Sequence, residues 1–151
     1  MSNQKLINFL NQELSNFYIL HVKFHRYHWF IQGHHFFQLH QLFEDLYNEM
    51  GELVDTWAER ILAIGGKPLA TMTKYLDEAT LKEAQADDKE EEVMQQLQAD
   101  FSQIIKEMKE IGLPLAEENG DKPTEDLMTC LIGDFEKHLW MFRAHQAYEQ
   151  R

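Results

Sequence analysis

The feature that most restricts the fold is a long amphipathic stretch in the first half of the chain. Between residues 36 and 64, apolar residues recur at intervals of three or four positions. That interval is the repeat of an α-helix, and it excludes a β-strand, in which side chains alternate between two faces. A stop signal follows, because Gly65 and Gly66 are succeeded by Pro68. The stretch therefore predicts one long helix with the apolar positions Phe36, Leu39, Phe43, Leu46, Met50, Leu53, Trp57, Ile61 and Ile64.

The rest of the chain carries the same helical repeat, which predicts an all-α protein. We expect a four-helix bundle with a short extra helix in the long crossover between helices 2 and 3. Gly112 and Pro114 are expected to end the third long helix. A loop over residues 115–124, with Asn119-Gly120 as its turn, is expected to lead to the fourth. Besides the helix over residues 36–64, the expected helices cover residues 3–31, 71–76, 89–112 and 124–149.

Potential metal ligands lie along the helix predicted for residues 36–64. His40 and Glu44 are four residues apart, and so are Asp55 and Glu59. Residues at this spacing share one helix face, so each couple can offer two donor atoms to one cation. Within one helix the two couples cannot share a cation, because eleven residues separate Glu44 from Asp55. That separation is a rise of roughly 16 Å, whereas bonds to metals are about 2 Å long.

The spacing of the two couples suggests that a second copy of the chain completes the site. The outer two residues and the inner two have the same sequence midpoint, between residues 49 and 50. Two copies of the helix, packed antiparallel about a dyad at that point, would place each couple opposite the other couple of the partner. A two-fold contact is self-complementary, so two identical sites would form. Gly51, beside the dyad, would allow the backbones to approach closely.

A fifth ligand candidate precedes this helix. His28 and His40 are disposed evenly about the turn at residues 32–34, so an antiparallel hairpin would put them side by side. Mixed imidazole and carboxylate ligands suit Fe(II), Mn(II) or Zn(II) better than a soft metal. Each residue alone is also explained as a solvated charge or a packed histidine, so a purely structural helical bundle stays open. The predicted site consists of His28, His40 and Glu44 from one subunit with Asp55 and Glu59 from another.

Composition restricts the class of protein. The 151 residues suffice for one domain, residues 1–151, with a full apolar core. A net charge of −12 disfavours passive adhesion to nucleic acid or to anionic membranes. The single Cys130 cannot form an intrachain disulfide and fits a reducing cytosol. The sequence has no signal-peptide pattern and no apolar run long enough for a transmembrane helix, so we expect a cytoplasmic protein without a membrane partner.

Three segments resemble the signature of a known family. The run HRYHWFIQGHHFFQLH, the following FEDLYNEMGELVDTWAERILAIGG and the later DFEKHLWMFRAH are similar to the Dps proteins, mini-ferritins that protect DNA in starved cells. The resemblance covers essentially the whole chain. It implies a ferritin-like four-helix bundle that assembles into a hollow homo-dodecamer. It also implies a ferroxidase centre between dyad-related subunits, with the ligands His28, His40, Glu44, Asp55 and Glu59; at position 44 many members have Asp.

The resemblance also implies the chemistry. Such a protein oxidises Fe(II) with hydrogen peroxide, or more slowly with dioxygen, and stores the Fe(III) as mineral; Zn(II) or Mn(II) would fit the same ligands. Iron would enter through acidic pores, for which the matching residues are Glu117, Asp121 and Asp126. The alternative is a nucleoid protein that binds and compacts DNA. Direct binding requires several basic residues to neutralise phosphates, and only Lys5 lies near the first helix, so we expect no DNA binding.

The remaining histidines and tryptophans receive structural interpretations. No Glu-x-x-His or His-Glu-x-x-His spacing occurs, which excludes an ordinary di-iron bundle site and a zinc protease. His34 and His35, at the turn, are expected to be solvated. Trp29 and Trp57 are next to ligand candidates and could intercept oxidising equivalents, but we expect them to fill the core. Packed positions are expected for His21, His25, His138 and His145.

Overall fold

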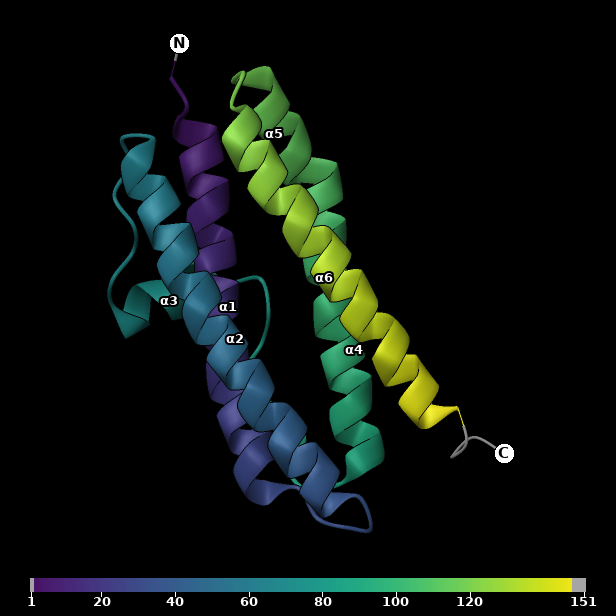
Figure 1. Cartoon of the computed structure of the whole chain (residues 1–151). Helices are drawn as coiled ribbons and strands as arrows, with labels where there is room; N and C mark the ends of the chain where they lie inside the picture. The colour runs from purple at the N-terminus through teal and green to yellow at the C-terminus, as the bar shows by residue number, and fades with distance from the viewer. Residues whose placement is uncertain (1, 148–151) are drawn as a thin grey trace. The chain divides into compact units, whose positions relative to one another are not determined.

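The computed structural model describes residues 2–147 and is built from helices (Figure 1). No β-strand occurs among these residues, which confirms the all-α prediction, and none of their helices is long and apolar enough to cross a membrane. The described chain forms two compact units, a first unit of residues 7–93 and a second unit of residues 2–6 and 94–147. The helices are α1 (Gln4–Phe30), α2 (Phe36–Ala63), α3 (Met72–Glu78), α4 (Glu90–Glu107), the π-helix η1 (Met108–Gly112), α5 (Leu113–Glu118) and α6 (Lys122–Gln146).

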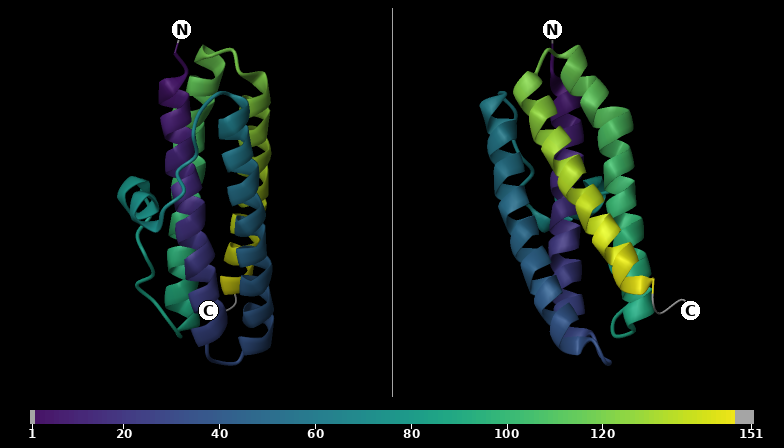
Figure 2. Two further views of the ribbon diagram at one scale, coloured as in Figure 1. Left: turned by 90° about the vertical axis from the view of Figure 1, so that its left-hand side faces the viewer. Right: turned by 45° about the vertical axis from the view of Figure 1, so that its right-hand side comes forward.

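In the first unit, α1 and α2 run side by side in opposite directions (Figures 1 and 2). The short turn between them contains Gly33 with a φ of 121°, a conformation that only glycine adopts without strain. The apolar face of α2 is buried nearly as predicted. Phe36 and Ile64, at its two ends, are half-buried, and in the middle Val54 is buried whereas Leu53 is half-buried. Steps of three and of four both fit the helical repeat, so the sequence pattern could not decide between these neighbours.

The C-terminal end of α2 is a two-glycine cap. Gly65 has a φ of 89°, and its N–H donates to the Leu62 carbonyl at 3.0 Å. The Gly66 N–H donates to the Ile61 carbonyl at 2.8 Å, which completes a Schellman motif. A Cβ at Gly66 would lie 2.9 Å from methyl groups of Ile61 and Ile7, so glycine is also required there by packing. The predicted end of the helix is confirmed.

The crossover after α2 is fastened to α1 by two buried asparagines. Backbone groups in an irregular segment lack the partners that a helix supplies, and here side-chain amides bond to several of them. Asn11 and Asn16 each present both ends of the amide group to this segment. Asn11 Nδ2 donates to the Lys67 carbonyl (3.2 Å) and its Oδ1 accepts from Leu69 N–H (2.9 Å), while Asn16 Oδ1 accepts from Thr80 N–H (2.9 Å) and Leu81 N–H (3.0 Å).

The short helix predicted in the crossover is present as α3 and extends to Glu78. Thr71 caps its N-terminus, where the side chain accepts a hydrogen bond from the Lys74 N–H at 3.3 Å. Figure 2 shows α3 beside α1, outside the hairpin of α1 and α2. Tyr75 is its buried residue and donates from its hydroxyl to the Leu69 carbonyl at 2.8 Å.

In the second unit, the helix that begins as α4 continues through η1 into α5. The prediction that it ends at Gly112 was wrong, and so was the first half of the predicted loop over residues 115–124. In an α-helix, Pro114 would clash with the carbonyl four residues earlier. The wider π-turn of η1 precedes the proline and removes that conflict, so the chain stays helical. The turn follows at Asn119-Gly120, as predicted, with a φ of 63° at Gly120.

α6 runs back alongside α4 and α5 (Figures 1 and 2). Its N-cap is Asp121, whose carboxylate accepts from the Thr124 N–H at 3.1 Å and from the Thr124 hydroxyl at 2.6 Å. The end predicted at residue 149 lies outside the described residues. His138 is half-buried and lies parallel to the Phe142 ring, with centroids 5.8 Å apart, and His145 is also half-buried, so both are packed as expected.

The crossover contacts generate a stability prediction. Asn16→Ala leaves the Thr80 amide and the buried Leu81 amide without their acceptor, and we expect a loss of about 1–3 kcal/mol of unfolding free energy. Hydrogen exchange at the Thr80 and Leu81 amides should accelerate first. The matched control is Gln95→Ala, which removes an exposed side-chain amide on α4, with a change within about 0.5 kcal/mol. Equal protection of both amides in Asn16→Ala and in the unmodified protein would contradict this account.

Candidate metal centre

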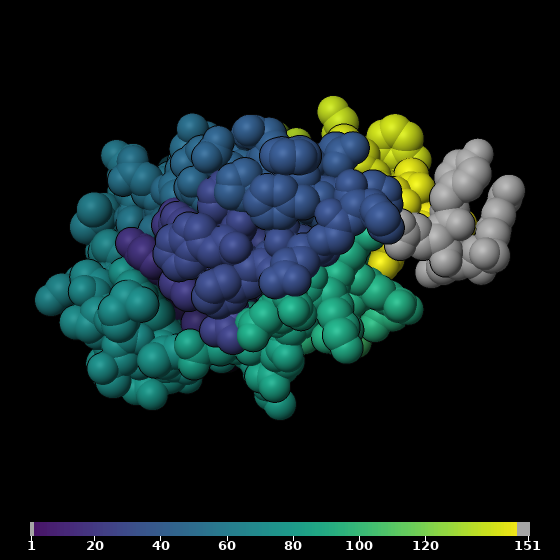
Figure 3. All heavy atoms as spheres, turned by 90° about the horizontal axis from the view of Figure 1, so that it is seen from below, coloured from purple at the N-terminus to yellow at the C-terminus, as the bar shows by residue number. Residues whose placement is uncertain are grey.

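The turn between α1 and α2 brings His28 and His40 into direct contact. Their rings stack, with centroids 3.7 Å apart and planes 12° from parallel. Each Nδ1 lies 2.7 Å from the backbone oxygen of the other histidine. Figure 3 shows the surface at this end of the first unit, where the end of α1 adjoins the beginning of α2. The hairpin thus places the two imidazoles as a reciprocally bonded pair.

These two hydrogen bonds fix the tautomer of both rings. A carbonyl oxygen can only accept, so each Nδ1 must carry the hydrogen and donate it. In the neutral ring, Nε2 then keeps its lone pair, which is the form of imidazole that binds a metal. His28 is buried and His40 is half-buried, so packing also restricts the rings. The pair can offer two oriented nitrogen donors to a cation.

Glu44 lies one turn after His40 on α2 and is half-buried. Its carboxylate accepts from the Tyr47 hydroxyl at 3.4 Å and from Gln41 Nε2 at 3.2 Å. Burial, followed by the nearby charge of Glu44, raises the pKa of Tyr47, so the phenol remains a donor at neutral pH. A carboxylate has about four acceptor positions, so capacity for a cation remains after these bonds.

Asp55 and Glu59 form the second couple, exposed on α2. A hydrogen bond with Asp55, then the charge of Asp55, and then burial raise the pKa of Glu59. Two carboxylates in contact repel each other when both are ionised. A divalent cation between them would relieve that repulsion, so this couple has the chemistry of one half of a cation site.

The five predicted ligands do not close around one point within a single chain. In the part of the chain that the structure describes, no three of them have ligand atoms within 4.8 Å of one another. Gly51, between the two couples, is exposed. A Cβ there would meet only the His21 ring, at an ordinary contact distance of 3.7 Å. Packing inside the chain therefore does not require glycine at this position.

His21 and His25 pack beside these residues, as expected. His21 Nδ1 is 2.8 Å from the Tyr47 carbonyl, and the His25 ring stacks on the Tyr47 ring with centroids 3.9 Å apart. Burial, followed by the neighbouring His21, lowers the pKa of His25, so its ring is neutral at pH 7. Sequence reasoning missed Tyr47, although its position three residues after Glu44 on one helix face was the available signal.

Two expectations about single residues were wrong. His35 is not simply solvated, because its Nδ1 lies 2.8 Å from Glu90 Oε1. The two are 55 residues apart, so no helical spacing could reveal the pair. Trp57 is fully buried as expected, but Trp29 is 65% exposed. Position 29 lies two residues after the buried Tyr27, on the opposite side of α1, which explains its exposure.

The three acids expected to line an iron-entry pore lie in the second unit. Glu117 is exposed near the end of α5. Asp121 is half-buried, and its carboxylate is engaged as the N-cap of α6. Asp126 is exposed, with one oxygen 3.7 Å from Lys122 Nζ. Within the described residues these acids form no cluster of three, so a carboxylate ring would need further copies of the chain.

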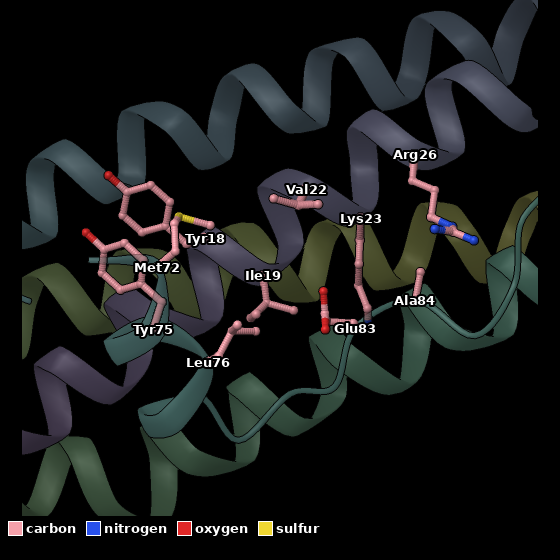
Figure 4. A pocket seen from close by; sticks show the side chains of 10 residues that line it. All are labelled: Tyr18, Ile19, Val22, Lys23, Arg26, Met72, Tyr75, Leu76, Glu83 and Ala84. Carbon is pink, nitrogen blue, oxygen red and sulfur yellow. The ribbon is translucent and has the colours of Figure 1, made fainter. Parts of the chain in front are cut away.

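A cavity of about 150 Å³ lies in the first unit, lined by α1, α3 and the segment after α3 (Figure 4). Its lining is mainly apolar and includes Tyr18 and Tyr75, whose rings stack with centroids 4.1 Å apart. Glu83 is the one carboxylate among the lining residues, and no histidine accompanies it. This cavity is therefore not the metal centre.

Comparison with known proteins gives concordant matches over nearly the whole chain. A family model described as the ferritin-like domain matches residues 7–151. General stress protein 20U of Bacillus subtilis (strain 168) is 41% identical over 143 residues, which cover 95% of this chain and 98% of that protein. DNA protection during starvation protein 2 of Bacillus anthracis is 39% identical over 142 residues, which cover 94% and 97%.

A solved structure gives the same result. The crystal structure of a Dps protein from Bacillus brevis matches with a TM-score of 0.92 at 37% identity, over 96% of this chain and 99% of that one. The expected four-helix bundle is thereby confirmed as the fold class. The chain belongs to the ferritin-like family, in its Dps branch, a family of iron storage and DNA protection.

Proposed function

We propose that this protein oxidises Fe(II) with hydrogen peroxide, or with dioxygen, at a centre shared by two subunits, and stores the Fe(III) as mineral inside a hollow dodecamer. The observation that carries the proposal is the reciprocal bonding of His28 and His40. It leaves an Nε2 lone pair on each imidazole, and Glu44 follows His40 by one turn of α2, so the residues offer donor types suited to iron. Iron is the substrate here rather than a resident cofactor, and Mn(II) or Zn(II) suits the same donors.

In the proposed centre, a partner subunit supplies Asp55 and Glu59. The argument for this is geometric: the two couples on α2 are too far apart for one ion, but they are symmetric about a point between residues 49 and 50. The exposed Gly51 next to that point supports it, because no contact within the chain requires glycine there. The hydrogen bond with Asp55, followed by the charge of Asp55, raises the pKa of Glu59, and a shared cation would relieve the repulsion between the two carboxylates.

The ligand set accounts for the direction of the reaction. Three carboxylates and two imidazoles favour the harder Fe(III) product, so bound Fe(II) gives up an electron readily. Two Fe(II) ions and two protons reduce one peroxide to two water molecules. The Nδ1–H bonds of His28 and His40 to carbonyl oxygens increase the basicity of both imidazoles. Consuming Fe(II) and peroxide together prevents hydroxyl-radical formation, which protects DNA without contact.

The proposal also covers how iron enters the shell, where in the cell the protein acts and how much of the chain forms the domain. Glu117, Asp121 and Asp126, repeated around a three-fold axis of the shell, would concentrate cations at an entry pore. We place the protein in the cytoplasm, on the grounds of its single Cys130 and the reducing chemistry that Fe(II) requires. The match of one family model to residues 7–151 supports treating residues 1–151 as one ferritin-like domain.

The assembly can be tested directly. We expect light scattering to give a particle mass of about 216 kDa, which is twelve copies of the 18.0 kDa chain. In a closed shell every subunit has a dyad-related partner, so every centre can be completed. A stable monomer that oxidises Fe(II) at the full rate would contradict both the dodecamer and the shared centre.

A mixing experiment tests which subunits contribute the ligands. His40→Ala and Asp55→Ala should each abolish rapid Fe(II) oxidation, because every centre then lacks a ligand. In shells assembled from an equal mixture, a dimer of one variant with the other has one centre with both residues intact. Random pairing should therefore restore about a quarter of the unmodified activity. Stopped-flow absorbance of Fe(III) formation measures the recovery.

The matched control for mixing is a pair of variants from the same half-site. In mixed His40→Ala and Glu44→Ala shells, every centre lacks one of the two residues, so no activity should return. Recovery in this control, or none in the first mixture once mass spectrometry has verified mixing, would exclude the shared centre.

DNA binding is the alternative function, and the charge disfavours it. With a net charge of −12, we expect the metal-free protein not to retard plasmid DNA at neutral pH and physiological salt. A gel-shift titration decides this. Retardation under these conditions would favour the DNA-binding function, whereas retardation that depends on added Mg(II) would indicate bridging between two anionic surfaces.

A further inference from the structure

A second pair of histidines lies on α1. His21 and His25 are four residues apart, so they share one face of the helix. Their rings meet edge to face, with centroids 4.7 Å apart and planes at 82°. Neither residue is a ligand of the proposed iron centre. The pair is therefore a separate group of two potential metal ligands.

Hydrogen bonds fix the tautomer of both rings, as they do in the pair of His28 and His40. His21 Nδ1 lies 2.8 Å from the Tyr47 carbonyl oxygen, and His25 Nδ1 lies 3.1 Å from the His21 carbonyl oxygen. A carbonyl oxygen can only accept, so each Nδ1 carries the hydrogen and each Nε2 keeps its lone pair. Histidines that bind metals usually have this arrangement, in which one nitrogen donates to the protein and the other binds the cation.

Both Nε2 atoms are within reach of solvent. In the described part of the chain neither takes part in a hydrogen bond, and neither is fully buried. His25 lines a hollow on the surface of α1 together with Val22 and Trp29. Beside His21, the facing position on α2 is Gly51, where an added Cβ would lie 3.7 Å from His21 Cε1. Because glycine has no side chain, this position leaves the Cε1 edge of the His21 ring uncovered.

The separation of the two rings fits a shared cation. A metal–nitrogen bond is about 2 Å long and the centre of an imidazole lies roughly 1 Å beyond the nitrogen, so two rings on one ion have centroids about 4.5–5.2 Å apart. That range covers bond angles from about 90° to about 110° at the metal. The observed 4.7 Å lies within it, so the spacing of the rings needs little change when a cation binds.

The charges around the pair do not oppose a cation. Arg26 lines the same hollow as His25, but its guanidinium is ion-paired with Asp87. The whole chain has a net charge of −12, which raises the concentration of cations near its surface.

We propose that His21 and His25 form a second cation site, distinct from the iron centre, for a late divalent transition metal: Cu(II), Ni(II) or Zn(II). Both donors are imidazole nitrogens. Within the described residues no acid forms a group of three potential ligands with them, all within 4.8 Å of one another. Nitrogen donors without carboxylates favour these three metals over Fe(II) and Mn(II), and water fills the remaining coordination positions. The inference goes beyond the proposed function and does not depend on it.

Copper binding to the assembled protein tests the site. Cu(II) is titrated into His40→Ala protein, in which the iron centre lacks a ligand, and electron paramagnetic resonance reports the nitrogen atoms bound to copper. We expect one Cu(II) per chain with hyperfine splitting from two nitrogens. The splitting should change when the histidine nitrogens are replaced by their heavier isotope, which identifies the donors as imidazoles.

His21→Asn and His25→Asn are the informative variants in the same background. The amide of asparagine can donate in place of Nδ1, whereas the Nε2 donor is lost. Each variant should bind copper at least tenfold more weakly and show at most one imidazole nitrogen. His34→Asn is the matched control, because His34 is exposed and has no histidine four residues away. It should bind copper as tightly as the His40→Ala parent.

A crystal soaked in Cu(II) locates the ion without any substitution at this pair. We expect an anomalous difference peak bonded to Nε2 of both His21 and His25. Copper held by a single nitrogen in His40→Ala, copper binding that persists in both asparagine variants, or no peak at this pair would overturn the second site. None of these results bears on the proposed function. An unmodified protein that binds copper here but fails to oxidise Fe(II) would overturn the proposed function alone.

Discussion

The paired hydrogen bonds between His28 and His40 hold α1 against α2 and also set the orientation of two candidate metal ligands. Each imidazole donates to the backbone of the opposite helix, so α1 and α2 are connected at the proposed metal centre. The same bonds that stabilise the hairpin also expose the nitrogen lone pairs that bind a cation. A substitution of either histidine would therefore remove one imidazole and leave the backbone carbonyl of the other histidine without its donor.

The straightness of α2 imposes a second constraint. A rigid helix fixes the separation of its two ligand couples, and that separation is much larger than any coordination sphere. A chain with this spacing can use both couples only by pairing with another chain, and only in an antiparallel arrangement. In the proposed arrangement, iron oxidation and assembly would depend on the same face of α2, the face on which Gly51 is exposed.

Much of the fold could be predicted from periodicity and stop signals, as the seam of α2 and its two-glycine end illustrate. The two couples could be recognised in the sequence because the members of each lie one turn apart on one helix; that they bind a metal stays a prediction. What could not be predicted depends on contacts between distant segments. Glu90 reaches His35 across 55 residues, and the anchoring of the crossover depends on asparagines that look like ordinary helix residues. The helical continuation past Pro114 was missed because a π-turn leaves no mark in residue spacing.

The asparagine contacts also bear on which positions of the crossover can vary in sequence during evolution. The crossover is fastened at its two flanks, by Asn11 before α3 and by Asn16 after it. Between these attachments, α3 contributes a single buried residue, Tyr75. Most residues between the two attachments can therefore be substituted, because the side-chain amides of Asn11 and Asn16 hold the path of the chain. Substitutions at the exposed positions of α3 should therefore cost little stability.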